Sequence, residues 1–167
     1  MSDTIEGRVW VFGDDINTDL IIISSLQYAP VPEMARSCFS AIRPGWSDEV
    51  RPGDVIVAGR NFGVGSGRAI GDVFRHLGVS CIVAESFNGL GMRNCVNVAL
   101  PVLPCPGVTT AFTEGDVAEV AWKTGEVRNL TRGTALQGTP IPPELQTIVD
   151  SGGVIPHLRA QGFLAPG

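Results

Sequence analysis

The sequence predicts one α/β domain in which short strands and helices alternate. The chain has 167 residues, of which 44% are hydrophobic and 17% are charged. This composition supports a buried core and excludes a disordered chain. Three runs rich in β-branched residues are bounded by Gly, Pro or Asp, as strands are, and apolar residues recur at helical spacing between two of them. We therefore expect residues 1–167 to form a single domain around a strand–helix–strand unit.

The expected elements follow one another with short connections. Gly78 stands where a glycine ends a helix, and Thr124-Gly125 stands where a hairpin turns. The predicted strands are residues 7–12, 54–58, 80–84 and 101–103, the hairpin is residues 114–130, and the helices are residues 69–77, 90–99, 142–149 and 154–161. Residues 15–46 carry few regular signals and three prolines, which predicts a functional loop or a poorly ordered segment.

The charge pattern argues against a nucleic-acid or a membrane partner. The net charge is −5 and the twelve basic residues are scattered, whereas a nucleic-acid surface needs clustered Lys and Arg. Because no basic residues interleave with Trp46, Trp122 and Phe62, we expect these aromatic residues in the core or at an interface. The longest apolar run is far too short to cross a bilayer, and the acidic N-terminus lacks the apolar core of a secretion signal. These features predict a cytoplasmic protein.

The cysteines and histidines predict no metal site in this chain. No two cysteines are spaced as C-x-x-C, and neither histidine has a ligand residue nearby. Buried free thiols are the better interpretation, and any iron in the function would be held by another chain. The residues concerned are Cys38, Cys81, Cys95, Cys105, His76 and His157.

A glycine-rich segment between the second strand and the first helix is the most informative part of the sequence. Residues 59–71 read GRNFGVGSGRAIG, so Gly63, Gly65 and Gly67 alternate at this junction. Positions without a side chain let backbone N–H groups approach a ligand, and a helix start carries partial positive charge, so the loop should attract an anion. Ser66 and Arg68 are the polar side chains of the turn, and a cation at a helix start opposes the dipole unless an anion is bound.

Other interpretations of this loop are a nucleotide site or a simple tight turn. A dinucleotide fingerprint that starts at Gly63 would need glycine at position 68, and Glu85 comes slightly early for the acid that binds the ribose. A phosphate-binding P-loop would need a lysine after the glycines. The glycines alone fit a turn that packs a helix closely on a sheet. An acidic stretch, residues 13–22 (GDDINTDLII), by itself fits an ordinary Asx-rich turn and lacks the pattern of a calcium loop.

Three stretches together resemble the small subunits of 3-isopropylmalate dehydratase and homoaconitase and the swivelling C-terminal domain of aconitases. They are residues 13–22, residues 51–68 (RPGDVIVAGRNFGVGSGR) and residues 82–103 (IVAESFNGLGMRNCVNVALPVL). The resemblance covers nearly the whole chain in order. It implies a swivelling β/β/α domain of the aconitase C-terminal type, in which the strand–helix–strand unit carries the glycine-rich loop.

The resemblance also implies a hydro-lyase of leucine biosynthesis that needs two chains. A large subunit would hold a [4Fe–4S] cluster, this chain would hold no cofactor, and the substrate would be a hydroxy-dicarboxylate such as 3-isopropylmalate. By the same resemblance, Ser66 takes the proton from the carbon beside a carboxylate, and Arg68 binds a substrate carboxylate. The remaining implied site residues are Asp19, Gly65 and Gly67 for substrate binding and Ser25, Leu26, Gln27 and Tyr28 for substrate selection.

The loop departs from the usual family pattern, GCGSSREH, at four positions. Val64, Gly67, Ala69 and Ile70 replace a cysteine, a serine, a glutamate and a histidine. In the substrate-selecting loop, an arginine and a tyrosine are missing from their usual places. Because the two loops carry fewer polar groups, we expect a smaller or less charged substrate than citrate or homocitrate. A non-catalytic relative that keeps only the fold and the partner surface is the alternative, and retention of the serine and arginine argues against it.

Overall fold

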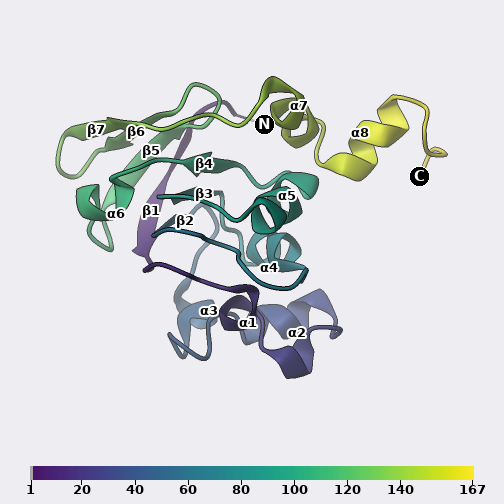
Figure 1. The fold of residues 1–167 in the computed structure, drawn as a ribbon, viewed down its shortest axis with the longest axis horizontal. Helices are drawn as coiled ribbons and strands as arrows, with labels where there is room; N and C mark the ends of the chain where they lie inside the picture. Colours follow the sequence, from purple (N-terminus) through teal and green to yellow (C-terminus); the bar gives the residue numbers. More distant parts are fainter. Residues whose placement is uncertain (1) are drawn as a thin grey trace.

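A computed structural model describes residues 2–167, and one seven-stranded sheet forms its centre (Figure 1). The strand order is β4-β3-β2-β1-β5-β6-β7. The strands are β1 Ile5–Val11, β2 Val55–Ala58, β3 Cys81–Ala84, β4 Val102–Pro104, β5 Val117–Ala121, β6 Glu126–Asn129 and β7 Thr134–Gln137. With helices between the strands, the α/β class predicted from the sequence is confirmed.

The sheet has a parallel half and an antiparallel half that meet at β1. β2 pairs with β1 in parallel, with Val9 opposite Val55, and β3 and β4 continue the parallel half. β5 pairs with β1 in the antiparallel sense, with Ile5 opposite Val120, and β6 and β7 continue that half. Every residue of β2 and β3 is buried, as expected for parallel strands covered on both faces.

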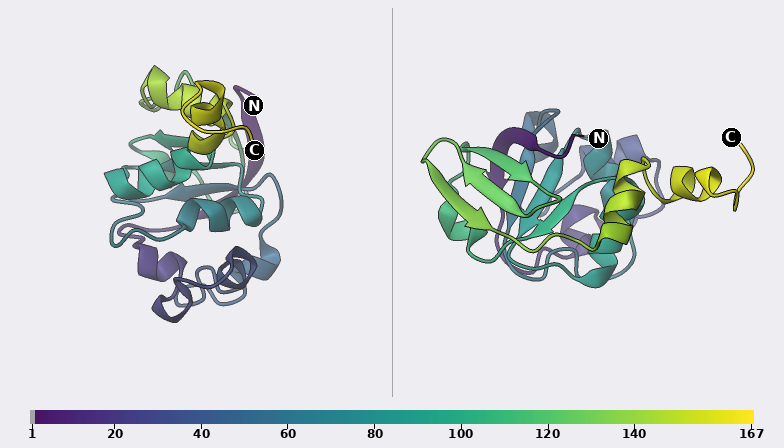
Figure 2. Two further views of the ribbon diagram at one scale, coloured as in Figure 1. Left: turned by 90° about the vertical axis from the view of Figure 1, so that its right-hand side faces the viewer. Right: turned by 90° about the horizontal axis from the view of Figure 1, so that it is seen from above.

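The helices gather at the two ends of the molecule and along the parallel half. They are α1 Thr18–Ile21, η1 (a 3-10 helix) Ser24–Leu26, α2 Val31–Arg36, α3 Trp46–Glu49, α4 Ile70–His76, α5 Gly89–Asn97, α6 Val108–Ala111, α7 Pro143–Asp150 and α8 Val154–Ala160. α1, α2 and α3 lie at one end, whereas α8 and the C-terminus project away from the body at the other (Figures 1 and 2). α4 packs against α2 and α5. Within residues 2–167, none of the helices has the length and apolar character that a bilayer crossing requires.

Residues 15–46 are not the irregular segment that the sequence indicated. They fold into α1, η1 and α2, which have four, three and six residues, too short for a helical period to show. Pro30 and Pro32 lie at the N-cap and in the first turn of α2, where a missing N–H breaks no helical hydrogen bond. β7 was not predicted from the sequence. Its residues are mostly exposed and only Leu136 is half-buried, so the strand has no apolar pattern.

An aromatic cluster holds the segment that contains α2 and α3 against the sheet. Phe39 stacks on Phe12 with ring centroids 4.2 Å apart, and it meets Trp46 edge-on at 4.8 Å. Such pairs add to the free energy of burying the rings. Trp46, Phe62 and Trp122 are almost completely buried, so the prediction that they belong to the core is confirmed.

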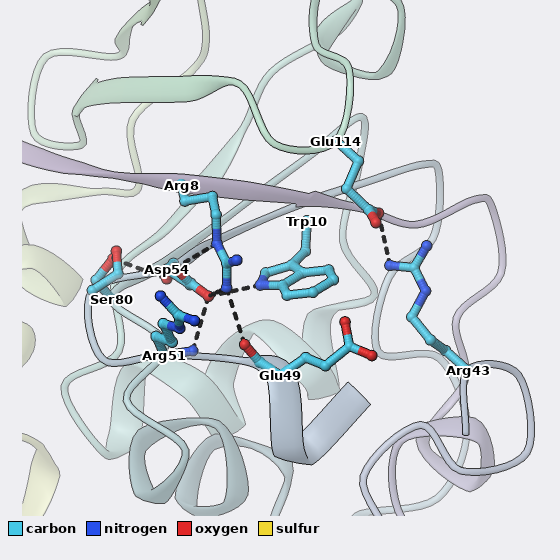
Figure 3. A network of polar contacts seen from close by, with 9 residues as sticks. Arg8, Trp10, Arg43, Glu49, Arg51, Asp54, Ser80 and Glu114 are labelled. Carbon is cyan, nitrogen blue, oxygen red and sulfur yellow. Dashed lines mark hydrogen bonds and ion pairs between the residues drawn. The ribbon is translucent and has the colours of Figure 1, made fainter. Parts of the chain in front are cut away.

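A buried carboxylate ties β1 to the start of β2 (Figure 3). Asp54 is 4% exposed, and it accepts hydrogen bonds from Arg8 Nη2 at 2.7 Å, Trp10 Nε1 at 2.7 Å and the backbone N–H of Arg51 at 2.9 Å. Burial by itself raises the pKa of Asp54, but these hydrogen bonds and the charge of Arg8 outweigh it and hold the pKa below its ordinary value. The ionised carboxylate is therefore part of the folded state.

Candidate functional site

The glycine-rich loop, residues 59–69, links β2 to α4. Gly63 has φ +78° and lies against the first turn of α5, so that a Cβ on Gly63 would stand 2.8 Å from the Cα of Gly91. Gly65 has φ +117°, and a Cβ there would stand 2.9 Å from Thr18 Oγ1. Both positions therefore need glycine, for their backbone conformation and for close approach.

Ser66 stands on the open side of this loop. Ser66 and its neighbours Gly65 and Gly67 are all exposed. A Cβ added to Gly67 would come near one atom outside the loop, Leu90 Cδ2 at 3.9 Å. The predicted hydroxyl thus faces solvent, where a substrate or a second chain can reach it.

The guanidinium of Arg68 is turned toward α1 and the residues that follow it. Arg68 is 8% exposed, its Nη1 donates to the Ile22 carbonyl, and its Nη2 is ion-paired with Asp19. Nη2 also donates to Ser24 Oγ at 3.3 Å. The buried Nε has no partner among residues 2–167. In this chain alone, the anion that balances Arg68 is its own Asp19.

α1 brings Asp19 to this position. Asn17 is the N-cap of α1 and accepts a hydrogen bond from the N–H of Leu20 at 2.8 Å, which starts the helix. The N–H of Thr18 donates to the Val64 carbonyl at 2.9 Å, which attaches α1 to the glycine-rich loop. The side chain of Asp19 remains 60% exposed, so another anion can replace it on Arg68 with little change in the burial of Asp19.

The predicted substrate-selecting residues lie directly beyond the partners of Arg68. They are Ser25 and Leu26 in η1, followed by Gln27 and Tyr28. Tyr28 is 93% exposed, whereas Leu26 and Gln27 are half-buried. Among the described residues, no hydrogen bond joins the side chains of Ser25 or Tyr28 to Arg68. The direct contact is Ser24, which sequence reasoning missed because a single serine carries no pattern of its own.

A cavity of about 520 Å³ opens beside the ends of β2 and β3. Its lining residues are Asp14, Arg60, Glu85, Pro106, Gly107, Thr109 and Thr110. Glu85 accepts hydrogen bonds from the N–H of Gly107 at 2.7 Å and from Thr109 Oγ1 at 2.7 Å. Burial raises the pKa of Glu85, but these hydrogen bonds outweigh it and the pKa is lowered. The carboxylate of Glu85 is therefore bonded to the start of α6. This argues further against Glu85 as the residue that binds the ribose of a nucleotide.

The four cysteines do not fit as ligands of an iron–sulfur cluster. Cys38, Cys81, Cys95 and Cys105 are buried free thiols. Burial raises the pKa of Cys95 to about 12 and that of Cys105 to about 11, and it raises the pKa of the other two thiols as well. A metal ligand has to be a thiolate within reach of the ion. Within residues 2–167, no group of three or more Cys, His, Asp and Glu is placed to hold a metal ion.

We expect all four thiols of the native chain to react slowly with a chromogenic disulfide reagent. Each unit by which a pKa is raised lowers the thiolate fraction about tenfold, so the native chain at pH 8 should react about 100-fold more slowly than the urea-unfolded chain. Stopped-flow absorbance measures both rates. Fast reaction of one thiol per native chain would contradict this and would reveal an accessible thiolate.

Comparisons with known proteins agree on one family. The chain is 40% identical over 161 residues to the "Isopropylmalate/citramalate isomerase small subunit" of Methanocaldococcus jannaschii, which covers 95% of this chain and 96% of the relative. It is 41% identical over 164 residues to the "3-isopropylmalate dehydratase small subunit 1" of Methanopyrus kandleri, with coverage of 97% and 96%. The crystal structure of a 3-isopropylmalate dehydratase (leuD) from Methanocaldococcus jannaschii superposes with a TM-score of 0.89 at 30% identity, with 95% of each chain covered. No family model matches the chain.

Proposed function

The chain belongs to the family of 3-isopropylmalate dehydratase small subunits, and from this membership we propose that it is the small subunit of a two-chain hydro-lyase. The reaction is the removal and addition of water, with net isomerisation, on a malate that carries an alkyl substituent. The partner is a large subunit that carries a [4Fe–4S] cluster, since the residues of this chain do not fit that group. In this proposal the small subunit acts as a domain that swivels over the site of the large subunit.

The observation that carries the proposal is an exposed hydroxyl two residues from a buried guanidinium. Ser66 is open to solvent, while Arg68 is held with Asp19 behind the loop. In the dehydration direction, Ser66 Oγ takes the proton from the carbon beside a substrate carboxylate, and in the hydration direction it returns that proton. A serine hydroxyl is a poor base, so its ionised form has to be favoured by nearby positive charge and by N–H donors.

Arg68 supplies that positive charge and binds a carboxylate of the substrate. Two of its three nitrogens are occupied within the chain, whereas Nε is buried and lacks a partner among the described residues. A substrate carboxylate can take the place of Asp19, whose side chain is mostly exposed. The exchange keeps the charge on Arg68 paired and releases a carboxylate into water, where it is well solvated.

Three of the four departures from the family pattern support a small, weakly charged substrate. Ala69 is the N-cap of α4 and makes no capping hydrogen bond through its side chain. Ile70 is completely buried in the core, so it offers no group to a ligand. Gly67 has no side chain where the family pattern has a serine, and the outside atom that a Cβ there would meet is apolar, Leu90 Cδ2 at 3.9 Å. A substrate arm with a third carboxylate would find no side-chain hydrogen-bond donor at these three positions.

The reconstituted enzyme should therefore prefer substituted malates to citrate. We expect kcat/KM for isopropyl- or methyl-substituted malate to exceed that for citrate by about 100-fold or more, since an unpaired charge costs more binding energy than a missing methylene. The measurement is absorbance of the unsaturated intermediate, with the small and large subunits combined without oxygen. A preference for citrate would contradict the substrate assignment, and a complex that assembles without turning over any hydroxy acid would indicate a non-catalytic relative.

A further inference from the structure

Leu90 is an apolar side chain that remains exposed beside the polar loop of the candidate site. It is the second residue of α5, and its N–H donates to Oδ1 of the N-cap residue Asn88 at 3.0 Å. Leu90 is 39% exposed, whereas Cys95 and Val96 farther along the same helix are buried. Contacts within the chain therefore use only part of its apolar surface.

Backbone contacts hold Leu90 against the glycine-rich loop. The N–H of Asn88 donates to the Phe62 carbonyl at 2.9 Å. Gly91 lies so close to the loop that a Cβ on it would stand 2.7 Å from the Cα of Gly63. The start of α5 cannot withdraw from the loop without losing these contacts, so the backbone that carries Leu90 is positioned before any ligand binds.

The tip of Leu90 is directed at the position between Ser66 and Arg68. That position is Gly67, where an added Cβ would lie 3.9 Å from Leu90 Cδ2 and no nearer to any atom outside the loop. Because Gly67 has no side chain, Cδ2 of Leu90 borders the loop at Gly67, the residue that follows Ser66. One wall of this otherwise polar site is therefore apolar.

We propose that Leu90 is a specificity-determining residue, which packs against the alkyl substituent of the substrate while Ser66 and Arg68 act on its malate part. This assignment rests on the proposed function. Burial of an alkyl group against this apolar side chain is favourable, because it removes apolar surface from water. A charged substituent would lose its hydration there without gaining a hydrogen bond, which is unfavourable. A single methylene in an apolar pocket changes kcat/KM by about 10- to 200-fold, so one leucine side chain is enough to rank substrates by their substituent.

The test is a comparison of two substrates in the two-chain complex. Leu90→Ala and an unmodified chain are each combined with the large subunit, and kcat/KM is measured for isopropyl-substituted and for methyl-substituted malate. We expect Leu90→Ala to lower the ratio of the two values, isopropyl over methyl, by about tenfold, because the larger group loses more contact. Leu130→Ala is the matched control, since Leu130 is similarly exposed, at 45%, and lies just beyond β6 in the antiparallel half of the sheet.

Each other outcome points to a different conclusion. If the unmodified complex turns over neither malate, the proposed function fails and the assignment of Leu90 fails with it. If it turns over both, and Leu90→Ala leaves the ratio unchanged or lowers both values by one factor, only the assignment of Leu90 is overturned. Weakened assembly in sedimentation velocity, with an unchanged substrate ratio, would instead make Leu90 a contact for the large subunit.

Discussion

Replacement of Ser66 by alanine should lower kcat of the reconstituted complex by about 10³-fold, because a positioned proton-transfer group contributes about 10²- to 10⁴-fold. The exposed Ser66 side chain makes no hydrogen bond with the described residues. Its removal should therefore leave the fold and the association with the large subunit intact. KM should change little, since Arg68 still binds the carboxylate.

The matched control is Ser2→Ala. Ser2 is exposed before the start of β1, where its carbonyl accepts a hydrogen bond from Trp122 Nε1 at 3.0 Å, a contact that the substitution keeps. The substitution removes only the exposed hydrogen bonds of the Ser2 hydroxyl with the backbone of Thr4. Initial rates at saturating substrate and sedimentation velocity are measured for both variants. Unchanged kcat in Ser66→Ala would remove the serine from the mechanism, and loss of association would show that its role is structural.

Replacement of Asp54 by asparagine should lower the free energy of unfolding at pH 7 by about 3 kcal/mol, because a buried carboxylate that pairs with a cation loses its charge. Asp54 is 4% exposed and accepts hydrogen bonds from Arg8, Trp10 and Arg51 (Figure 3). An amide offers one acceptor oxygen in place of two and turns a donor toward one of these groups. Urea denaturation followed by circular dichroism measures the difference.

The pH dependence of the stability difference distinguishes loss of the Asp54 charge from a general loss of packing. Since the pKa of Asp54 is lowered in the folded chain, its contribution is complete above the unfolded pKa, near 3.9, and is lost as the pH falls through the lower folded value. The difference between Asp54→Asn and the unmodified chain should therefore narrow when the pH is brought well below 4. A difference that stays constant with pH would contradict the assignment. The exposed Asp48 in α3 provides the control, and Asp48→Asn should change stability by less than about 0.5 kcal/mol.

Local pattern was enough to predict the strands and the helix that flank the glycine-rich loop. The runs VIVA and CIVA became β2 and β3, and the segment between them contains α4, because continuous apolar runs and helical periodicity are properties of neighbouring residues. The alternating glycines could also be recognised in the sequence, and two of them, Gly63 and Gly65, have positive φ. Where an element was very short or exposed, as in α1, η1 and β7, too few residues were present to form a pattern.

The pairings that make the site depend on positions far apart in the chain. Arg68 is 46 residues from Ile22 in the sequence and 44 residues from Ser24. No periodicity shows that Asp19 balances Arg68, that Ser24 joins it, or that Leu90 is directed at Gly67. These contacts follow from the placement of β1 beside β2 and from the close approach of α5 to the glycine-rich loop.

By itself the sequence determined the class of the fold, the loop that carries the candidate chemistry and the family to which the chain belongs. Tertiary structure alone decided which way Arg68 turns, which anion balances it and which apolar side chain lies against the loop at Gly67. The physical reason is that strand and helix patterns express local preference and burial. The direction of a side chain is set by the neighbours that packing brings to it from other elements.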